Sequence, residues 1–326
     1  MKLWTAATAV AAFLAAAAAA APAKVEIVSA DDISVTYREL QPLRLAVDGD
    51  LYHRKDCPAV PKNAESIAPG IATLRRLQPH ACAVGAKPEY AQFTIKRAPR
   101  DPNVIAVLFL GNSLTYFNEI PKITQAISAR EKRPLRVDAV TRSGVTLEQL
   151  WIDTDARKRL WLTHWDYVIL QGGAGAAHPT YNADVFQRYL HMFAAEVRQS
   201  GATPLYYMVW RHEEPPNYES ASLAAAKRAN VRVIPVALAW VDLIRRGRFE
   251  RLDAGGGHPD AFGAYLVACT VYSTIYGKPA HGTPHDFRHL AAPNETYDAA
   301  LREQRIDADD ARALQEAAWA AVCRIK

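Results

Sequence analysis

The sequence predicts an α/β protein: a three-layer α/β/α sandwich with a mostly parallel five-stranded sheet, preceded by a small strand-rich N-terminal appendage. From residue 104 onward, short apolar runs alternate with segments of helical periodicity, which is typical of a parallel sheet covered on both faces. Residues 24–98 instead hold short alternating runs that are typical of strands. Two prolines within residues 98–103 indicate a linker between the two parts.

The chain of 326 residues opens with a segment typical of a secretory signal peptide. Lys2 precedes an unbroken, alanine-rich apolar run, and Ala21, Pro22 and Ala23 resemble a small-residue cleavage site. We therefore expect residues 1–23 to be removed and the mature protein to be secreted or periplasmic, with no stable membrane insertion. A retained membrane anchor is the alternative, because the run approaches the roughly 20 residues that span a bilayer.

Charge and cysteine content limit the expected partners. The chain has 39 basic and 34 acidic residues, and neither sign forms a block that would follow a phosphate backbone, so we expect no nucleic-acid partner. All four cysteines lie beyond residue 23, which is compatible with disulfides in an oxidising compartment. Cys57 and Cys82 form the favoured pair, while Cys269 is expected either to pair with Cys323 or to be buried.

Two histidines stand near the first two cysteines. His53, Cys57, His80 and Cys82 have the side-chain chemistry of a tetrahedral zinc site. Their spacing is irregular and the expected compartment is oxidising, which favours a disulfide with two surface histidines instead. We therefore expect neither a metal nor an organic cofactor.

The elements of the larger part follow one another in a regular order. Apolar runs predict five strands, over residues 105–110, 135–140, 166–171, 204–210 and 231–236. Helical periodicity predicts helices over residues 119–129, from 146, from 182 to 201, over 259–276 and from about 307. Asn182 is expected to cap the most periodic of these helices, and Gly201 to end it.

The first strand of the predicted sheet ends in Gly111, Asn112 and Ser113, and the chain then turns helical. Open α/β folds bind ligands at the carboxyl edge of the sheet, so a serine at this junction is a candidate nucleophile. The alternative is that Ser113 only turns the chain or caps the helix.

A serine hydroxyl needs a base to take its proton, and His258 is the best placed of the ten histidines. Three glycines before it offer an imidazole little to pack against. Asp253, five positions before the histidine, is the candidate acid that would fix its tautomer. Asp260 or a backbone carbonyl is the alternative partner.

The run Gly111-Asn-Ser-Leu-Thr115 resembles the first block of the SGNH, or GDSL-like, hydrolases, and three later segments keep that family's order as far as about residue 277. The resemblance implies a serine esterase that forms an acyl-enzyme on Ser113. It also implies an oxyanion hole made by the backbone N–H groups of Ser113 and Gly144 and by the side chain of Gln171, as in branches with glutamine in place of the third-block asparagine.

The sequence departs from the family pattern at the acid and in the third block. The family spaces its acid three residues before the histidine, where this chain has Gly255, and the usual Gly-x-Asn-Asp is absent. The expected substrate is a small-molecule or carbohydrate carboxylic ester, with O-acetyl groups on carbohydrate as one candidate. The candidates to line its cleft are Tyr116, Asn118, Trp151 and residues 210–213, although aromatic side chains there are equally typical of the core or of an ordinary surface.

Two other functions remain open at this point. A polysaccharide O-acyltransferase would use the same acyl-enzyme but resolve it with a sugar hydroxyl instead of water. A catalytically inactive SGNH-fold binding protein is favoured by the missing acid and the missing asparagine. Only the second alternative predicts that an activated serine reagent leaves Ser113 unmodified.

Overall fold

The computed structural model describes residues 24–40, 46–47, 50–51, 90–172, 182–210 and 217–325. The chain divides into two compact units: Met1–Val28 with Thr36–Phe93, and Ser29–Val35 with Thr94–Lys326. Several sequence predictions lie outside the described residues: the leader, the Cys57–Cys82 pair, the zinc alternative, and residues 211–213 of the expected cleft.

The larger unit contains the predicted parallel sheet. Its five strands are hydrogen-bonded in the order β10-β9-β8-β6-β7, and every neighbouring pair is parallel. Four apolar side chains of the central strand, Val107 to Leu110, are fully buried, as expected for a strand covered on both faces. The strands are β6 (Ile105–Gly111), β7 (Leu135–Thr141), β8 (Tyr167–Gly172), β9 (Thr203–Met208) and β10 (Arg232–Ile234).

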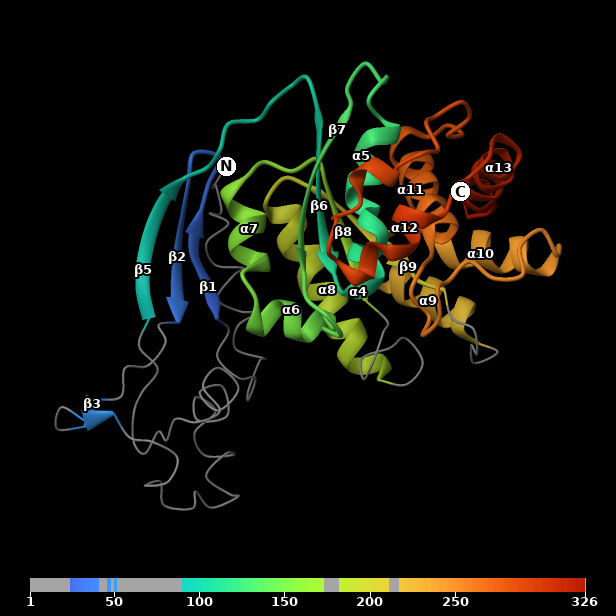
Figure 1. The fold of residues 1–326 in the computed structure, drawn as a ribbon. Coiled ribbons are helices and arrows are strands. Elements are labelled where there is room, and N and C mark those ends of the chain that lie inside the picture. The colour runs from blue at the N-terminus through green and yellow to red at the C-terminus, as the bar shows by residue number, and fades with distance from the viewer. Residues whose placement is uncertain are drawn as a thin grey trace, which may run out of the picture. The chain divides into compact units, whose positions relative to one another are not determined.

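Helices form the two outer layers (Figure 1). One layer holds α6 (Leu147–Asp153), α7 (Ala156–Leu162) and α8 (Ala183–Gln199), with α9 (Tyr218–Arg228) packed beside α8. The other layer holds α5 (Ile120–Ile127), α10 (Val236–Arg245) and α11 (Ala261–Tyr276), and α13 (Ala308–Arg324) packs against α10 and α11. The expected three-layer α/β/α sandwich is therefore confirmed.

Short helical segments complete the larger unit. Two follow β6 directly, namely α4 (Ser113–Tyr116) and the 3-10 helix η2 (Phe117–Glu119). Three lie between α11 and α13, namely η3 (Arg288–Leu290), η4 (Thr296–Asp298) and α12 (Ala299–Glu303). Both groups contribute to the site described below.

The last predicted strand is shorter than expected. We expected residues 231–236 to form a strand, but β10 ends at Ile234 and α10 begins at Val236. Pro235 separates them because it has no N–H to donate to the ladder, while its fixed φ suits a helix start. The apolar sequence of α10 continued the pattern of the strand, which concealed the boundary.

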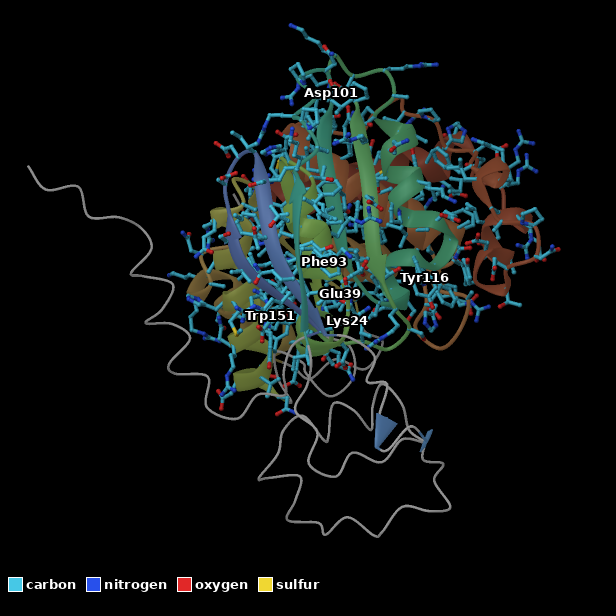
Figure 2. The ribbon with its side chains drawn as sticks, turned by 90° about the vertical axis from the view of Figure 1, so that its left-hand side faces the viewer. Lys24, Glu39, Phe93, Asp101, Tyr116 and Trp151 are labelled. Atoms are coloured by element: carbon cyan, nitrogen blue, oxygen red, sulfur yellow. The ribbon has the colours of Figure 1, made fainter. Side chains whose placement is uncertain are left out.

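Strand order places one end of the sheet where ligands bind in open α/β folds. The chain leaves β6 to form β7 on one side and returns to form β8 on the other, so the order reverses between β6 and β8. Register pairs Leu110 with Leu170, which brings the carboxyl ends of these two strands together. In Figure 2, Tyr116 and Trp151 lie toward this end of the unit, whereas Asp101 lies at the opposite end.

The N-terminal residues are strand-rich, as predicted. They form a three-stranded sheet in the order β1-β2-β5, and β3 pairs with β4 in an antiparallel ladder. Within the sheet, the rings of Tyr37 and Phe93 stack with their centroids 5.4 Å apart. The strands are β1 (Val25–Ala30), β2 (Ser34–Leu40), β3 (Ala46–Val47), β4 (Asp50–Leu51) and β5 (Tyr90–Lys96).

Three findings concern cysteines, metals and membranes. Cys269 and Cys323 are both free, and Cys269 is buried in α11, so the expected pairing of these two is wrong and burial is confirmed. Within the described ranges, no three His, Cys, Asp or Glu side chains are arranged to hold a metal ion. None of the helices in those ranges is long and apolar enough to cross a bilayer.

Candidate active site

Ser113 begins α4 directly after the central strand. Asn112 caps this helix: its Oδ1 accepts the N–H of Leu114 at 3.0 Å, and its Nδ2 donates to the carbonyl of Val145 at 3.0 Å. Ser113 is therefore the first helical residue and not the cap, and only 8% of its surface is exposed. The local turn is fixed by Asn112, which leaves the serine hydroxyl free for another role.

Gln171, at the end of the neighbouring strand β8, holds the serine turn by hydrogen bonds. Its Oε1 accepts hydrogen bonds from the backbone N–H of Asn112 at 2.7 Å and from the hydroxyl of Thr115 at 3.0 Å. A Cβ added to Gly111 would lie 2.6 Å from this Oε1 and 2.3 Å from the Thr115 Oγ1. A glycine is therefore required at position 111 by the close approach of Gln171.

Within the described chain, the Nε2 of the Gln171 amide lacks the hydrogen-bond partner that a buried donor normally has. This nitrogen is buried and donates to no acceptor among the described residues, and the side chain as a whole is 0% exposed. A buried donor without a partner costs about 1–3 kcal/mol. Because Oε1 must accept from the Asn112 N–H, this orientation of the amide is set by the backbone.

His258 reaches Ser113 across the carboxyl edge of the sheet. Its Nε2 lies 2.9 Å from the Ser113 Oγ, although the two residues are 145 positions apart in the chain. This distance is that of a hydrogen bond between a base and the hydroxyl that it activates. The structure thus brings together the two residues that the sequence predicted as nucleophile and base.

The His258 loop is a tight turn of glycines. Gly255, Gly256 and Gly257 all have positive φ, at 98°, 63° and 76°. Such values favour glycine, because a Cβ would be strained there. The turn closes where the Ala254 N–H donates to the carbonyl of His258 at 3.0 Å. Three glycines therefore give the loop its shape but supply no side chain to hold it.

Trp210 supports the His258 loop through a hydrogen bond. Its Nε1 donates to the carbonyl of Gly257 at 3.1 Å, and its ring stacks on Trp240 with centroids 4.0 Å apart and an interplanar angle of 2°. We expected Trp210 to line the substrate cleft, but only 2% of its surface is exposed. That expectation is wrong, because Trp210 is a buried support of the histidine loop.

The two acidic candidates lie on the same loop but serve other contacts. The Oδ1 of Asp253 accepts the N–H of Gly255 at 2.9 Å, and within the described chain the His258 ring makes one hydrogen bond, to Ser113. Asp260 caps α11 by accepting the N–H of Gly263 at 2.8 Å. Burial raises the pKa of the Asp260 carboxyl, and the nearby Asp253 charge adds to the shift.

Phe117 covers the imidazole. Its ring stacks on that of His258 with centroids 3.9 Å apart and planes 17° from parallel. Burial lowers the pKa of His258 from its ordinary value. Burial therefore favours the neutral imidazole, which is the form that a general base needs.

Asn118 is a buried residue whose side chain links segments of the site by hydrogen bonds. It was expected to line the cleft, but it is 1% exposed, and its Nδ2 donates to the carbonyl of Pro259 at 2.6 Å. Its Oδ1 accepts the N–H of Leu301 at 2.8 Å, from a helix 183 positions further along the chain. The expectation for Asn118 is wrong: the residue ties the serine segment to the residue that follows His258.

Tyr297, in η4, belongs to the site but was missed by sequence reasoning. Its ring packs edge-on against Tyr116 at 5.2 Å and lies 5.9 Å from Phe117. The segment that carries it has no motif and no helical periodicity. Only contact across the fold identifies it.

The predicted oxyanion donors are placed as follows. Gly144 follows β7 with φ at 66° and is exposed. Neither its N–H nor that of Ser113 makes a hydrogen bond within the described part of the chain. Trp151, the remaining expected cleft residue, packs edge-on against Phe193 at 4.9 Å.

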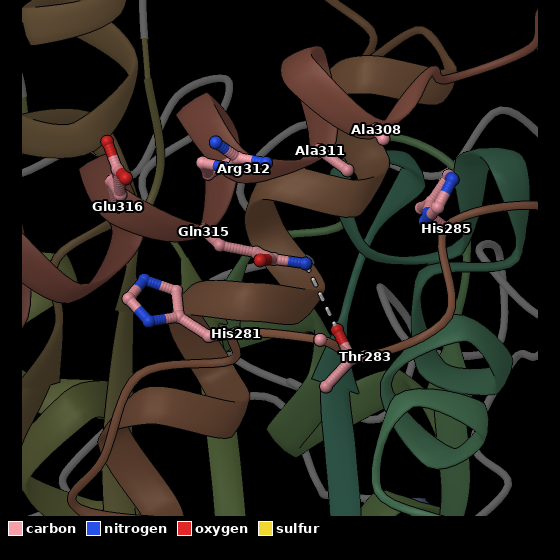
Figure 3. A pocket seen from close by; sticks show the side chains of 9 residues that line it. His281, Thr283, His285, Ala308, Ala311, Arg312, Gln315 and Glu316 are labelled. Carbon is pink, nitrogen blue, oxygen red and sulfur yellow. Dashed lines mark hydrogen bonds between the residues drawn. The ribbon is translucent and has the colours of Figure 1, made fainter.

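One cavity lies away from these residues, between α13 and the loop after α11. It has a volume of about 450 Å³. Figure 3 shows Gln315 reaching across it toward Thr283, with Nε2 3.5 Å from the Thr283 Oγ1. None of its lining residues belongs to the Ser113–His258 site.

Comparisons with known proteins show a shared fold. No protein-family profile and no curated protein matches the sequence. A protein from Slackia heliotrinireducens described as an SGNH hydrolase is 24% identical, with a TM-score of 0.44, over 53% of this chain and 100% of its own. The acetyl xylan esterase AlAXEase is 16% identical, with a TM-score of 0.43, over 52% and 100%. A DUF4886 family protein from Bacteroides uniformis is 18% identical, with a TM-score of 0.50, over 68% and 95%, and the chain shares the fold of that protein.

Proposed function

We propose that the protein is a serine hydrolase of carboxylic esters with Ser113 as nucleophile and His258 as base. The observation that carries the proposal is the 2.9 Å approach of the His258 Nε2 to the Ser113 Oγ. The pair stands at the carboxyl edge of the sheet, where the strand order reverses and ligands bind in open α/β folds.

The reaction proceeds in two balanced steps. In the first, the Ser113 Oγ bonds to the ester carbonyl carbon while His258 takes the hydroxyl proton, and the C–O bond to the alcohol breaks as that proton passes to the leaving oxygen. In the second, water gives its proton to His258 and its oxygen to the acyl carbon. The carboxylic acid leaves and Ser113 regains the proton.

The negative oxygen of each tetrahedral intermediate needs hydrogen-bond donors, each worth about 3 kcal/mol. The backbone N–H groups of Ser113 and Gly144 support this role, because neither donates to another group in the described chain. The buried, unpartnered Nε2 of Gln171 supports it as the third donor.

The role of Asp253 stays a prediction. An acid that orients the base would accept a hydrogen bond from the His258 Nδ1, whereas the described bond of the Asp253 carboxylate is to Gly255, inside the same loop. That contact supports a role in shaping the turn that presents His258.

The proposed substrate class is a carbohydrate carrying O-acetyl groups. The half-buried rings of Tyr116 and Tyr297 support it, because they lie beside the Phe117 ring that covers His258. Aromatic faces with polar tips suit the apolar faces and hydroxyls of sugars. Release of acetate from an acetylated polysaccharide, compared with hydrolysis of a simple acetyl ester, tests this part of the proposal.

The test of catalysis is hydrolysis of a short-chain chromogenic ester by the purified chain and by Ser113→Ala. We expect Ser113→Ala to lose activity by roughly a thousandfold or more. A fluorophosphonate should label the wild-type protein at Ser113 and leave the variant unlabelled. If no short ester is hydrolysed and Ser113 is not labelled, the proposal is contradicted and a binding protein of the same fold is favoured.

The acceptor is decided by product analysis. With water as acceptor, each turnover releases one free carboxylic acid. Transfer of the acyl group to an added oligosaccharide, with less free acid than alcohol released, would show an O-acyltransferase instead.

A further inference from the structure

Among the described residues, the contacts of the His258 imidazole are to its face and to its Nε2 edge. Phe117 stacks on the ring at 3.9 Å, and the Nε2 edge is bound to Ser113. On the Nδ1 side lies the glycine turn, where a Cβ added to Gly256 would be 3.7 Å from Nδ1. The described hydrogen bond of the Asp253 carboxylate goes to a backbone N–H of that turn.

The position of Phe117 is set by a kink directly after it. Asn118 and Glu119 have φ values of 52° and 55°, two consecutive non-glycine residues in the left-handed region. Such residues persist only where surrounding contacts determine them, and they gather at functional sites. Here the Asn118 amide supplies those contacts, since it bonds to the backbone of Pro259 and of Leu301.

This bracing couples Phe117 to the base. Pro259 follows His258 directly, so the hydrogen bond from Asn118 fixes the backbone on both sides of the stacked rings. Tyr297 packs against Phe117 with ring centroids 5.9 Å apart. The stacked ring is therefore held by its own backbone and by a second aromatic ring.

We propose that Phe117 is a positioning residue of the base: its ring, held by Asn118 and Tyr297, directs His258 to Ser113. This inference rests on the proposed function, because it explains how the proposed base, His258, is kept in position. The two ways of holding an imidazole have opposite electrostatic signatures. A carboxylate at the edge raises the pKa of the ring, whereas a covering ring excludes water and lowers it.

Titration of His258 in the full chain separates these cases. The protein is labelled with ¹⁵N-histidine, and His258→Gln assigns the resonance. We expect Phe117→Leu to raise the pKa of His258, because water reaches the uncovered face. Tyr116→Leu is the matched control, since it removes a ring of the same cluster that does not stack on the imidazole, and we expect the pKa to stay unchanged.

The same titration in Asp253→Asn gives the contradicting outcome. Loss of a carboxylate bound to Nδ1 would lower the pKa of His258 by about one unit or more. That result, or an unchanged pKa in Phe117→Leu, would overturn the proposal. The titration needs no turnover, so failure of the esterase proposal and failure of this one are told apart.

Kinetics supply the second readout. We expect Phe117→Leu to lower kcat by about tenfold with little change in KM, because a misdirected base slows the chemical step. Phe117→Trp keeps an aromatic face and should recover part of the loss. The loss in Asp253→Asn should stay near tenfold, far below the roughly 10⁴-fold typical when an orienting carboxylate is removed. A loss of that size in Asp253→Asn, or none in Phe117→Leu, would contradict the proposal.

Thermal unfolding checks that each variant is folded before it is measured. If Phe117→Leu does not fold, Phe117→Tyr and Phe117→Trp replace it. These variants keep a ring over the imidazole, so they should leave the pKa of His258 low. A pKa that rises in both of them while the fold is retained would count against positioning by stacking.

Discussion

The proposed nucleophile and the proposed base are held in different ways. The Ser113 turn grows out of the central strand and is bonded to the next strand through Gln171, so the register of the sheet places it. The His258 loop contains three glycines and is held by side chains from elsewhere, among them Trp210, Phe117 and Asn118. The serine is positioned by secondary structure, and the histidine by tertiary contacts.

The difference predicts where substitutions will be costly. On the serine side, a change in Gln171 is expected to displace Ser113 directly, because the Gln171 side chain is hydrogen-bonded to the backbone of Asn112, the residue before Ser113. On the histidine side, each support contributes a part, and the loss of one leaves the others. We therefore expect larger effects for the serine side and smaller, graded effects for the histidine side.

The largest effect is expected for Gln171→Glu. The carboxyl keeps an oxygen for the Asn112 N–H and the Thr115 hydroxyl but removes the Nε2 donor. If Nε2 stabilises the oxyanion, kcat falls by about 10²–10³-fold. Steady-state kinetics measure it, with Gln187→Glu as the control, because Gln187 is a half-buried glutamine of α8 whose hydrogen bonds are to Ala225 and Arg228 of α9. A kcat within about threefold of wild type would show that two backbone donors suffice.

Gly111→Ala is expected to cost about a hundredfold in kcat, since the added Cβ pushes on Thr115 and Gln171 and displaces the serine turn. Stability should also fall, by about 1–3 kcal/mol, which is the usual cost of overpacking. Gly247→Ala is the control: this glycine has positive φ but open space around it. The contrast between the serine and histidine sides would be contradicted if Gly111→Ala were as active as the Gly247→Ala control.

Trp210→Phe tests the histidine side. It removes the Nε1–H bonded to Gly257 but keeps a ring against Trp240. We expect a loss of about tenfold in kcat, and a loss of stability of about 1 kcal/mol for one hydrogen bond. Chemical denaturation and ester kinetics measure the two together. A loss of about a hundredfold would mean that the loop depends on one contact and would remove the contrast between the sides.

The smallest effect concerns pH. Burial lowers the pKa of His258, and a general base acts in its neutral form, so kcat/KM falls only as pH drops through that lowered pKa. We expect the midpoint of the acid limb to lie below the ordinary value of 6.5. A pH–rate profile measures it. A midpoint above 6.5 would indicate an acidic partner on the ring.

Local patterns predicted the serine side well. A buried apolar run that ends in glycine, asparagine and serine is visible in sequence, and it predicted both β6 and the strand-to-helix junction at Ser113. His258 was found for a similar reason, because three glycines before a histidine at the start of a helix give its imidazole little to pack against. These features depend on neighbours within a few residues.

The supports of the base could not be predicted in the same way. Asn118 and Trp210 were expected in the cleft because polar and aromatic residues near strand ends face ligands in many folds. Their real contacts, with Pro259 and Gly257, join parts of the chain 141 and 47 positions apart. The short helix α9 was also missed, because its run of alanines gives little contrast between faces.

Two free cysteines in the described part of the chain make the opening of α11 observable. Cys323 is exposed, while Cys269 is buried in α11, the helix that begins just beyond His258. Alkylation of Cys269 is slow for two reasons: the reagent cannot reach the buried thiol, and burial raises the pKa of that thiol and so disfavours the reactive thiolate. An alkylating reagent should modify Cys323 in the native protein and reach Cys269 only in molecules whose α11 has opened. The ratio of the two modified peptides therefore reports how often the helix that follows the His258 loop unfolds, without any mutation.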